Sequence, residues 1–152
     1  MERSPDVRPS GTLSPESILL VLLRLSAAVM LLAFPMVLLP VEWMAGTHRW
    51  LGLGEFPASP LVDYLARSIS FLYGFHGGLL LLVARDLRRY RGLLVYIIAM
   101  GFAFGACIIA IDLHAGLPLP WTLGEGPLII VTAAIMALLL RAVPRDGRRL
   151  SP

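Results

Sequence analysis

Apolar residues gather in four long blocks along the chain, and short polar segments separate them. The blocks run over residues 17–39, 61–84, 92–114 and 126–143. An α-helix of about 20 predominantly apolar residues crosses the hydrocarbon core of a bilayer, and each block reaches or approaches that length. The pattern predicts an all-α integral membrane protein, folded as a four-helix bundle, with one membrane domain over residues 17–143.

Proline and serine mark where these helices are expected to begin and end. The segment Ser14-Pro15-Glu16-Ser17 has the cap residue, proline and acid that favour a helix start. Pro35 is expected to bend the first span and Pro40 to end it. Residues 1–16, rich in proline and serine, are expected to be a disordered cytoplasmic tail.

Two connections are expected to be loops on the outer side. Residues 40–60 form the longest of them and carry Trp43 and Trp50. Tryptophan at the ends of a span is typical of the membrane interface. Residues 115–121 form a tight loop before the fourth span.

Composition supports the membrane interpretation and argues against a nucleic-acid-binding domain and a disulfide-bonded fold. Hydrophobic residues make up 57% of the chain and charged residues 15%, against about 25% charged in a typical soluble domain. The net charge of +3 comes from arginines beside apolar blocks, and no segment builds the basic face that a nucleic-acid-binding domain requires. Cys107 is the single cysteine, so an intramolecular disulfide is excluded.

The arginines are distributed unevenly between the two ends of the predicted spans. Because arginine-rich short loops stay in the cytoplasm, this bias predicts that both termini and the link after the second span are cytoplasmic. Residues 144–152 then form a basic cytoplasmic tail, and the membrane is expected to be the cytoplasmic membrane of a bacterium. Arg49 is on the other side, and the arginines of the cytoplasmic side are Arg3, Arg8, Arg85, Arg88, Arg89, Arg91, Arg141, Arg145, Arg148 and Arg149.

Small residues on the second and third spans predict how those two helices pack. Gly101 and Gly105 form a GxxxG pair, which allows close approach between membrane helices. The second span carries small and polar residues with the mirrored helical spacing. An antiparallel hairpin with one register would pair Gly74 with Gly105, Gly78 with Gly101, and Arg67 with Asp112.

Polar residues gather at the expected outer ends of the spans. They are either a pocket for a small polar or amphipathic ligand or an ion-pair latch that fixes the bundle. A partner at the same depth offsets part of the cost of a charge in hydrocarbon, which favours the latch. Glu125 is expected at the start of the fourth helix, where the helix dipole favours an acid. The members of this outer polar cluster are Glu42, Asp63, Arg67, Asp112, His114 and Glu125.

A second polar pair is expected in the inner half of the membrane. Arg24 and His76 lie at similar predicted depth in the first and second spans. They either share a polar contact or act separately, with Arg24 extending to the inner headgroups and His76 bonded to a neighbouring backbone or hydroxyl group. The three histidines lie at different depths, which argues against haem, and no cofactor or metal is predicted.

The region from about Leu61 to Leu140 resembles the DoxX-like small membrane proteins of bacteria. The resemblance rests on Arg67, the basic link at residues 85–91, the glycine-bearing third span, the segment from Asp112 to Pro118, and Glu125. It implies a four-helix membrane bundle and assigns no catalytic residue.

The sequence contains no nucleophile elbow, phosphate loop or HExxH motif. We therefore expect a non-enzymatic membrane protein of structural or accessory type that binds a small or lipid-like ligand at its outer face. One alternative is an accessory subunit of a membrane redox or transport complex. Another is a membrane enzyme that uses Asp112, Glu125 and His114 as acid–base groups.

Overall fold

The computed structural model describes residues 14–57 and 59–144, and these residues form helices and turns without a strand. Four segments in this part of the chain are long and apolar enough to cross a membrane, which is compatible with a multi-pass membrane protein. The helices are α1 (Pro15–Leu31), the 3₁₀ turn η1 (Phe34–Val37), α2 (Val41–Trp50), α3 (Pro60–Arg85), α4 (Arg91–Ala115) and α5 (Leu119–Ala142). The predicted tails at 1–13 and 145–152 lie outside the described residues.

The first span begins where its sequence indicates, but its α-helix is shorter than predicted. Ser14 caps α1 by accepting a hydrogen bond from the Ser17 amide at 3.1 Å. The helix ends at Leu31 because Pro35, four residues on, has no N–H to bond to that carbonyl and its ring crowds it. The chain continues as the 3₁₀ turn η1, which completes the apolar span to Val37.

Two predictions about the connecting segments are wrong. The expected loop at 40–60 contains the helix α2, which starts after Pro40. The fourth helix begins at Leu119 rather than at residue 126, because Pro120 is tolerated in the first turn and does not block helix formation there. Gly116, with a φ of 69°, ends α4 in the left-handed conformation that glycine favours.

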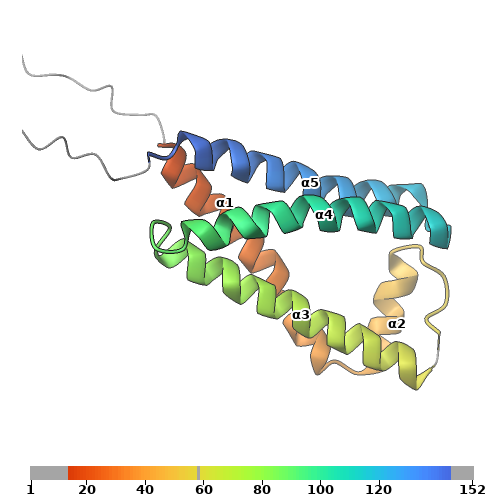
Figure 1. Cartoon of the computed structure of the whole chain (residues 1–152). Helices are drawn as coiled ribbons and strands as arrows, with labels where there is room; N and C mark the ends of the chain where they lie inside the picture. The colour runs from red at the N-terminus through yellow and green to blue at the C-terminus, as the bar shows by residue number, and fades with distance from the viewer. Residues whose placement is uncertain (1–13, 58, 145–152) are drawn as a thin grey trace, which may run out of the picture.

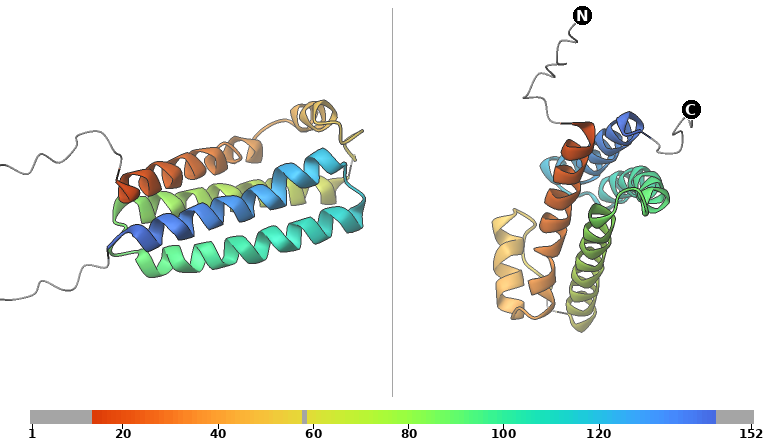
Figure 2. Two further views of the ribbon diagram at one scale, coloured as in Figure 1. Left: turned by 90° about the horizontal axis from the view of Figure 1, so that it is seen from above. Right: turned by 90° about the vertical axis from the view of Figure 1, so that its left-hand side faces the viewer.

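The helices form two antiparallel pairs, α1 with α3 and α4 with α5, joined through contacts of α1 with α5. The start of α1, the end of α5 and the α3–α4 turn all lie at one end of the molecule, which we call the link end (Figures 1 and 2). The other end carries α2 and the α4–α5 turn and is called the α2 end. The α3 and α4 helices meet at the link end and diverge toward the α2 end (Figure 1).

The buried hydrophobic core lies toward the link end. Leu19, Leu23, Leu94 and Val83 have no exposed surface, and Leu80 has only 2%. In contrast, large apolar side chains around the outside of all four long helices are exposed, and only 17–22% of the residues in each span's most apolar stretch are buried in the protein. The core members are Leu19, Leu23, Ala27, Leu80, Val83, Ala84, Leu87, Leu94, Ile97, Ile98, Ala133, Met136, Leu140 and Val143.

Arg91 joins α4 to the end of α5 by hydrogen bonds at the link end. Its guanidinium donates to the carbonyl of Leu140 at 2.7 Å and to that of Val143 at 3.3 Å. The last carbonyls of a helix have no partner within the helix and carry partial negative charge. Arg91 therefore caps α5 from the start of α4, a role that its predicted contribution to membrane orientation did not suggest.

The predicted glycine register between the second and third spans is wrong. Gly74 packs against the ring of Phe34 in η1, and a Cβ added at Gly78 would meet no atom within 4 Å. The GxxxG face of α4 does pack closely, but against α5, where Gly105 adjoins Gly126. Gly74 therefore packs on η1 and Gly105 on α5, and Gly78 packs on neither, so the predicted pairs do not form.

Gly77, which is not part of the predicted register, is the glycine that brings α3 against α1. A Cβ at this position would lie 2.9 Å from the Ala27 carbonyl oxygen and 3.2 Å from the Leu31 amide nitrogen. Both neighbours are backbone atoms, so they cannot move aside as a flexible side chain can. Gly126 plays the equivalent part in the α4–α5 contact, with a Cβ there 2.8 Å from the Gly105 carbonyl oxygen.

Gly77→Ala and Gly78→Ala form a matched pair that tests the α1–α3 contact. We expect Gly77→Ala to lower the free energy of unfolding by about 1–3 kcal/mol, because the added methyl group overpacks a backbone contact. Gly78→Ala should be neutral or stabilising by about 0.5–1 kcal/mol, because alanine favours the helix. Unfolding in mixed micelles, followed by circular dichroism, measures both; equal effects would contradict this contact.

Candidate functional site

The predicted outer polar cluster does lie toward the α2 end, but the structure divides it. Asp63 and Arg67 lie on α3 and face η1, whereas Asp112 and Glu125 lie on α4 and α5. Glu42 is exposed in the first turn of α2, where an acid complements the helix dipole. His114 is exposed in the last turn of α4. Among the described residues, no group of three His, Cys, Asp or Glu side chains is arranged to hold a metal ion.

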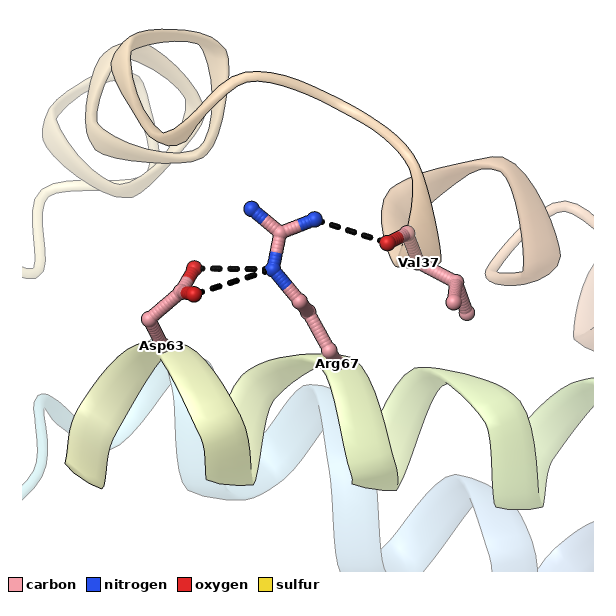
Figure 3. A network of polar contacts seen from close by, with 3 residues as sticks. All are labelled: Val37, Asp63 and Arg67. Atoms are coloured by element: carbon pink, nitrogen blue, oxygen red, sulfur yellow. Dashed lines mark hydrogen bonds and ion pairs between the residues drawn. The ribbon is translucent and has the colours of Figure 1, made fainter. Parts of the chain in front are cut away.

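Arg67 is held by two partners on different segments (Figure 3). Its Nε donates to both Asp63 carboxylate oxygens at 3.0 Å, one helical turn away on α3. Its Nη1 donates to the Val37 carbonyl oxygen at 2.7 Å. Val37 is the last residue of η1, so the bond satisfies a carbonyl that the 3₁₀ turn leaves free. The guanidinium thereby ties the end of the first span to α3.

The predicted Arg67–Asp112 pairing is wrong. Asp112 shares a helix face with Gly105 and Ile109, and that face packs against α5. Arg67 faces η1, which belongs to the other helix pair. The divergence of α3 from α4 toward the α2 end separates the two faces further.

A shallow, widely open depression, which we call the groove, lies on α3 beside the Arg67 side chain. It is lined by Val37, Arg67, Ser68, Phe71 and Leu72. Phe71 is 50% exposed and Leu72 is 62% exposed, and Phe71 packs on Phe34 with a ring-centroid distance of 5.4 Å. The groove thus has a polar end at Arg67 and Ser68 and an apolar continuation one turn closer to the link end.

Asp112 and Thr122 are the buried polar side chains of the α4–α5 contact, with 3% and 4% of their surface exposed. Both residues lie beyond the Gly105–Gly126 contact toward the α2 end, Asp112 on α4 and Thr122 on α5. Asp112 Oδ2 and Thr122 Oγ1 have no hydrogen-bond partner among the described residues. Burying a polar atom without a hydrogen-bond partner costs free energy, so these two side chains destabilise the α4–α5 contact unless another group binds them.

Glu125 lies in the second turn of α5 rather than at its start, because the helix begins at Leu119. The dipole argument for this acid therefore fails, since that effect is confined to the first turn. Instead, the Tyr73 hydroxyl on α3 donates to Glu125 Oε1 at 3.4 Å, a long bond that connects the two helix pairs. Nothing in the sequence pattern indicated Tyr73.

The predicted inner pair, Arg24 and His76, is not joined by a hydrogen bond or ion pair in the part of the chain that the structure describes. Arg24 is exposed on α1 and His76 is half-buried on α3. The Ala27–Gly77 contact sets the α1–α3 register, and it places Arg24 about one helical turn closer to the link end than His76.

A pair of double-mutant cycles tests where Arg67 is bound. We expect Asp63→Asn and Arg67→Gln to show a coupling energy of about 0.5–1 kcal/mol, as in a partly exposed ion pair. Asp112→Asn and Arg67→Gln should be additive within about 0.5 kcal/mol, because these residues share no partner. Unfolding free energies in mixed micelles give both numbers, and a larger coupling for the Asp112 cycle would reinstate the rejected pairing.

Comparisons with protein-family models, with curated proteins and with solved structures found no match. The role of the chain must therefore be inferred from its own residues. The strongest arrangement among them is the Asp63–Arg67–Val37 network with the groove beside it.

Proposed function

We propose that this chain is a non-enzymatic, four-span membrane protein that binds an amphipathic, lipid-like ligand in the groove beside Arg67. The groove carries the proposal. It joins a guanidinium with an unused nitrogen to exposed apolar side chains along α3, and an amphipathic molecule has the same two parts. The role is structural or accessory, and the groove is placed at the outer face.

The depth of Arg67 in the helix supports this location. Arg67 is seven residues from the start of α3, so about 10 Å along its axis. The 26 residues of α3 span about 39 Å, which exceeds a hydrocarbon core of about 30 Å. If the excess of about 9 Å is shared by the two ends, the Arg67 backbone lies about 6 Å inside the hydrocarbon core, and its side chain extends toward Asp63 and the headgroups. The apolar part of the groove lies deeper.

The surface of α2 supports the same placement. Trp43 and Trp50 are seven residues apart, so they share one face of this short helix, and they are 68% and 84% exposed. Exposed tryptophan is typical of the membrane interface. The proposed arrangement is a four-helix bundle with α2 at the outer interface and the link end, with both termini, in the cytoplasm of a bacterium. It agrees with the DoxX-like resemblance, which remains a proposal.

Labelling of single cysteines tests the orientation. In a Cys107→Ser background, Glu55→Cys at the α2 end should react with a membrane-impermeant maleimide on intact cells. Gly92→Cys at the link end should react only after permeabilisation. Both positions are exposed, and neither change alters an arginine of the link. The reverse pattern would contradict the proposed orientation.

Ligand retention tests the function. We expect the protein, purified in mild detergent, to carry a co-purifying lipid in native mass spectrometry, and Arg67→Gln to lower its occupancy about tenfold, which corresponds to roughly 1.4 kcal/mol. Arg85→Gln, which removes the same charge from the other end of α3, should leave occupancy unchanged. Recovery of the bare wild-type protein would refute ligand binding.

Arg24 favours a second candidate, an accessory subunit of a membrane redox or transport complex. This arginine is exposed nine residues into α1, and no hydrogen bond or ion pair to it occurs within residues 14–57 and 59–144. A charge within a span is commonly paired inside an assembly. Co-purification of a second membrane protein that is lost on Arg24→Gln would support this candidate.

A further inference from the structure

The polar end of the groove presents two opposite charges side by side. The Arg67 and Asp63 side chains are 30% and 37% exposed, and they lie one turn apart on the same face of α3. Neither charge is sealed from a ligand that approaches from the membrane. Together they offer a cationic donor and an anionic acceptor within the reach of one small headgroup (Figure 3).

Donors and acceptors remain for a ligand on both residues. Nε and Nη1 of Arg67 are used by Asp63 and Val37, whereas Nη2 takes part in no hydrogen bond of the described residues. Its two N–H groups suit a phosphate oxygen. Each Asp63 oxygen accepts one bond from Nε, and a carboxylate has about four acceptor positions, so further N–H donors fit.

We propose that this groove binds a zwitterionic phospholipid with an ethanolamine headgroup, its phosphate on Arg67 and its ammonium on Asp63. The acyl chains follow the exposed side chains of Phe71 and Leu72 toward the middle of the membrane. The inference rests on the proposed function, because it names the chemical class of the lipid-like ligand of the same groove.

Charge and hydrogen bonding select this headgroup over the other common ones. An anionic glycerol headgroup gains from Arg67 but meets the Asp63 carboxylate only 3.0 Å from the guanidinium nitrogen, with no cation to offer it. A choline headgroup has the positive charge but no N–H donor for the carboxylate. The primary ammonium of ethanolamine supplies both, so it satisfies Asp63 while the phosphate satisfies Arg67.

Competition among lipids of identical acyl chains tests the proposal. The full chain is delipidated in detergent, supplied with equal amounts of phosphatidylethanolamine, phosphatidylglycerol and phosphatidylcholine, and analysed by native mass spectrometry. We expect the wild-type protein to retain the ethanolamine lipid at least fivefold over each of the others. Asp63→Asn should abolish this preference and favour phosphatidylglycerol, because the remaining Arg67 charge is then uncompensated.

Two further variants separate headgroup recognition from a loss of structure. Asp63→Glu keeps the carboxylate and should keep the ethanolamine preference. Asp86→Asn removes one acid at the other end of α3 and should change nothing. If Asp63→Asn fails to fold, the wild-type ranking alone decides the matter.

The outcomes also separate this inference from the proposed function. Retention of one lipid with no preference among the three headgroups would overturn the headgroup assignment and leave lipid binding intact. A preference for phosphatidylglycerol in the wild-type protein would also overturn it. Retention of no lipid at all would overturn both.

Discussion

The close backbone contact between α1 and α3 at Gly77 determines where the polar groups of the α2 end can meet. The missing side chain lets the Ala27 backbone lie against α3, and this fixes the register of the two helices. Pro35 then ends α1 at Leu31, and the chain turns into η1 while it is still beside α3. Phe34 packs on Gly74, and one turn further the Val37 carbonyl comes within 2.7 Å of Arg67.

The exposed apolar surface sets the second constraint. Exposure to water of apolar side chains such as Leu32 (72% exposed) and Leu38 (87% exposed) would be unfavourable. Similar exposed apolar side chains occur on all four long helices. The protein buries a dense core only toward the link end, and the apolar surface exposed elsewhere is compatible with burial in a bilayer. At the α2 end the helices diverge, and α2 adds the exposed side chains of Trp43 and Trp50.

Hydrophobic length alone was enough to predict four long apolar helices, and the structure contains them. Helix partners were harder to predict, because many registers pair small residues with small residues. The Gly74–Gly105 match was one of these, and no sequence feature indicated that Gly105 packs on Gly126. Asp63 and Arg67 do bond across one turn of α3, a contact that their i, i+4 spacing allows.

The remaining errors arise where one local rule was given too much weight. The loop expected at residues 115–121 contains the first turn of α5, because Pro120 lies where a missing N–H costs nothing. That error moved Glu125 to a helix start and hid its contact with Tyr73. The sequence pattern indicates only a cytoplasmic charge at Arg91, because the carbonyls that it caps lie 49 and 52 residues further along the chain.

The choice between a structural latch and a binding pocket, which the sequence left open, does not have to be exclusive. Arg67 uses Nε and Nη1 to tie η1 to α3, and this fixes the plane of the guanidinium. A guanidinium whose plane is fixed loses little conformational entropy when its third nitrogen binds a ligand, so the latch preorganises the proposed site. By contrast, Asp112 is buried against α5. Only 3% of its surface is exposed, which is too little to contact a ligand from the bilayer. The proposed ligand therefore belongs at Arg67, where a charge in the membrane is both held in place and still accessible.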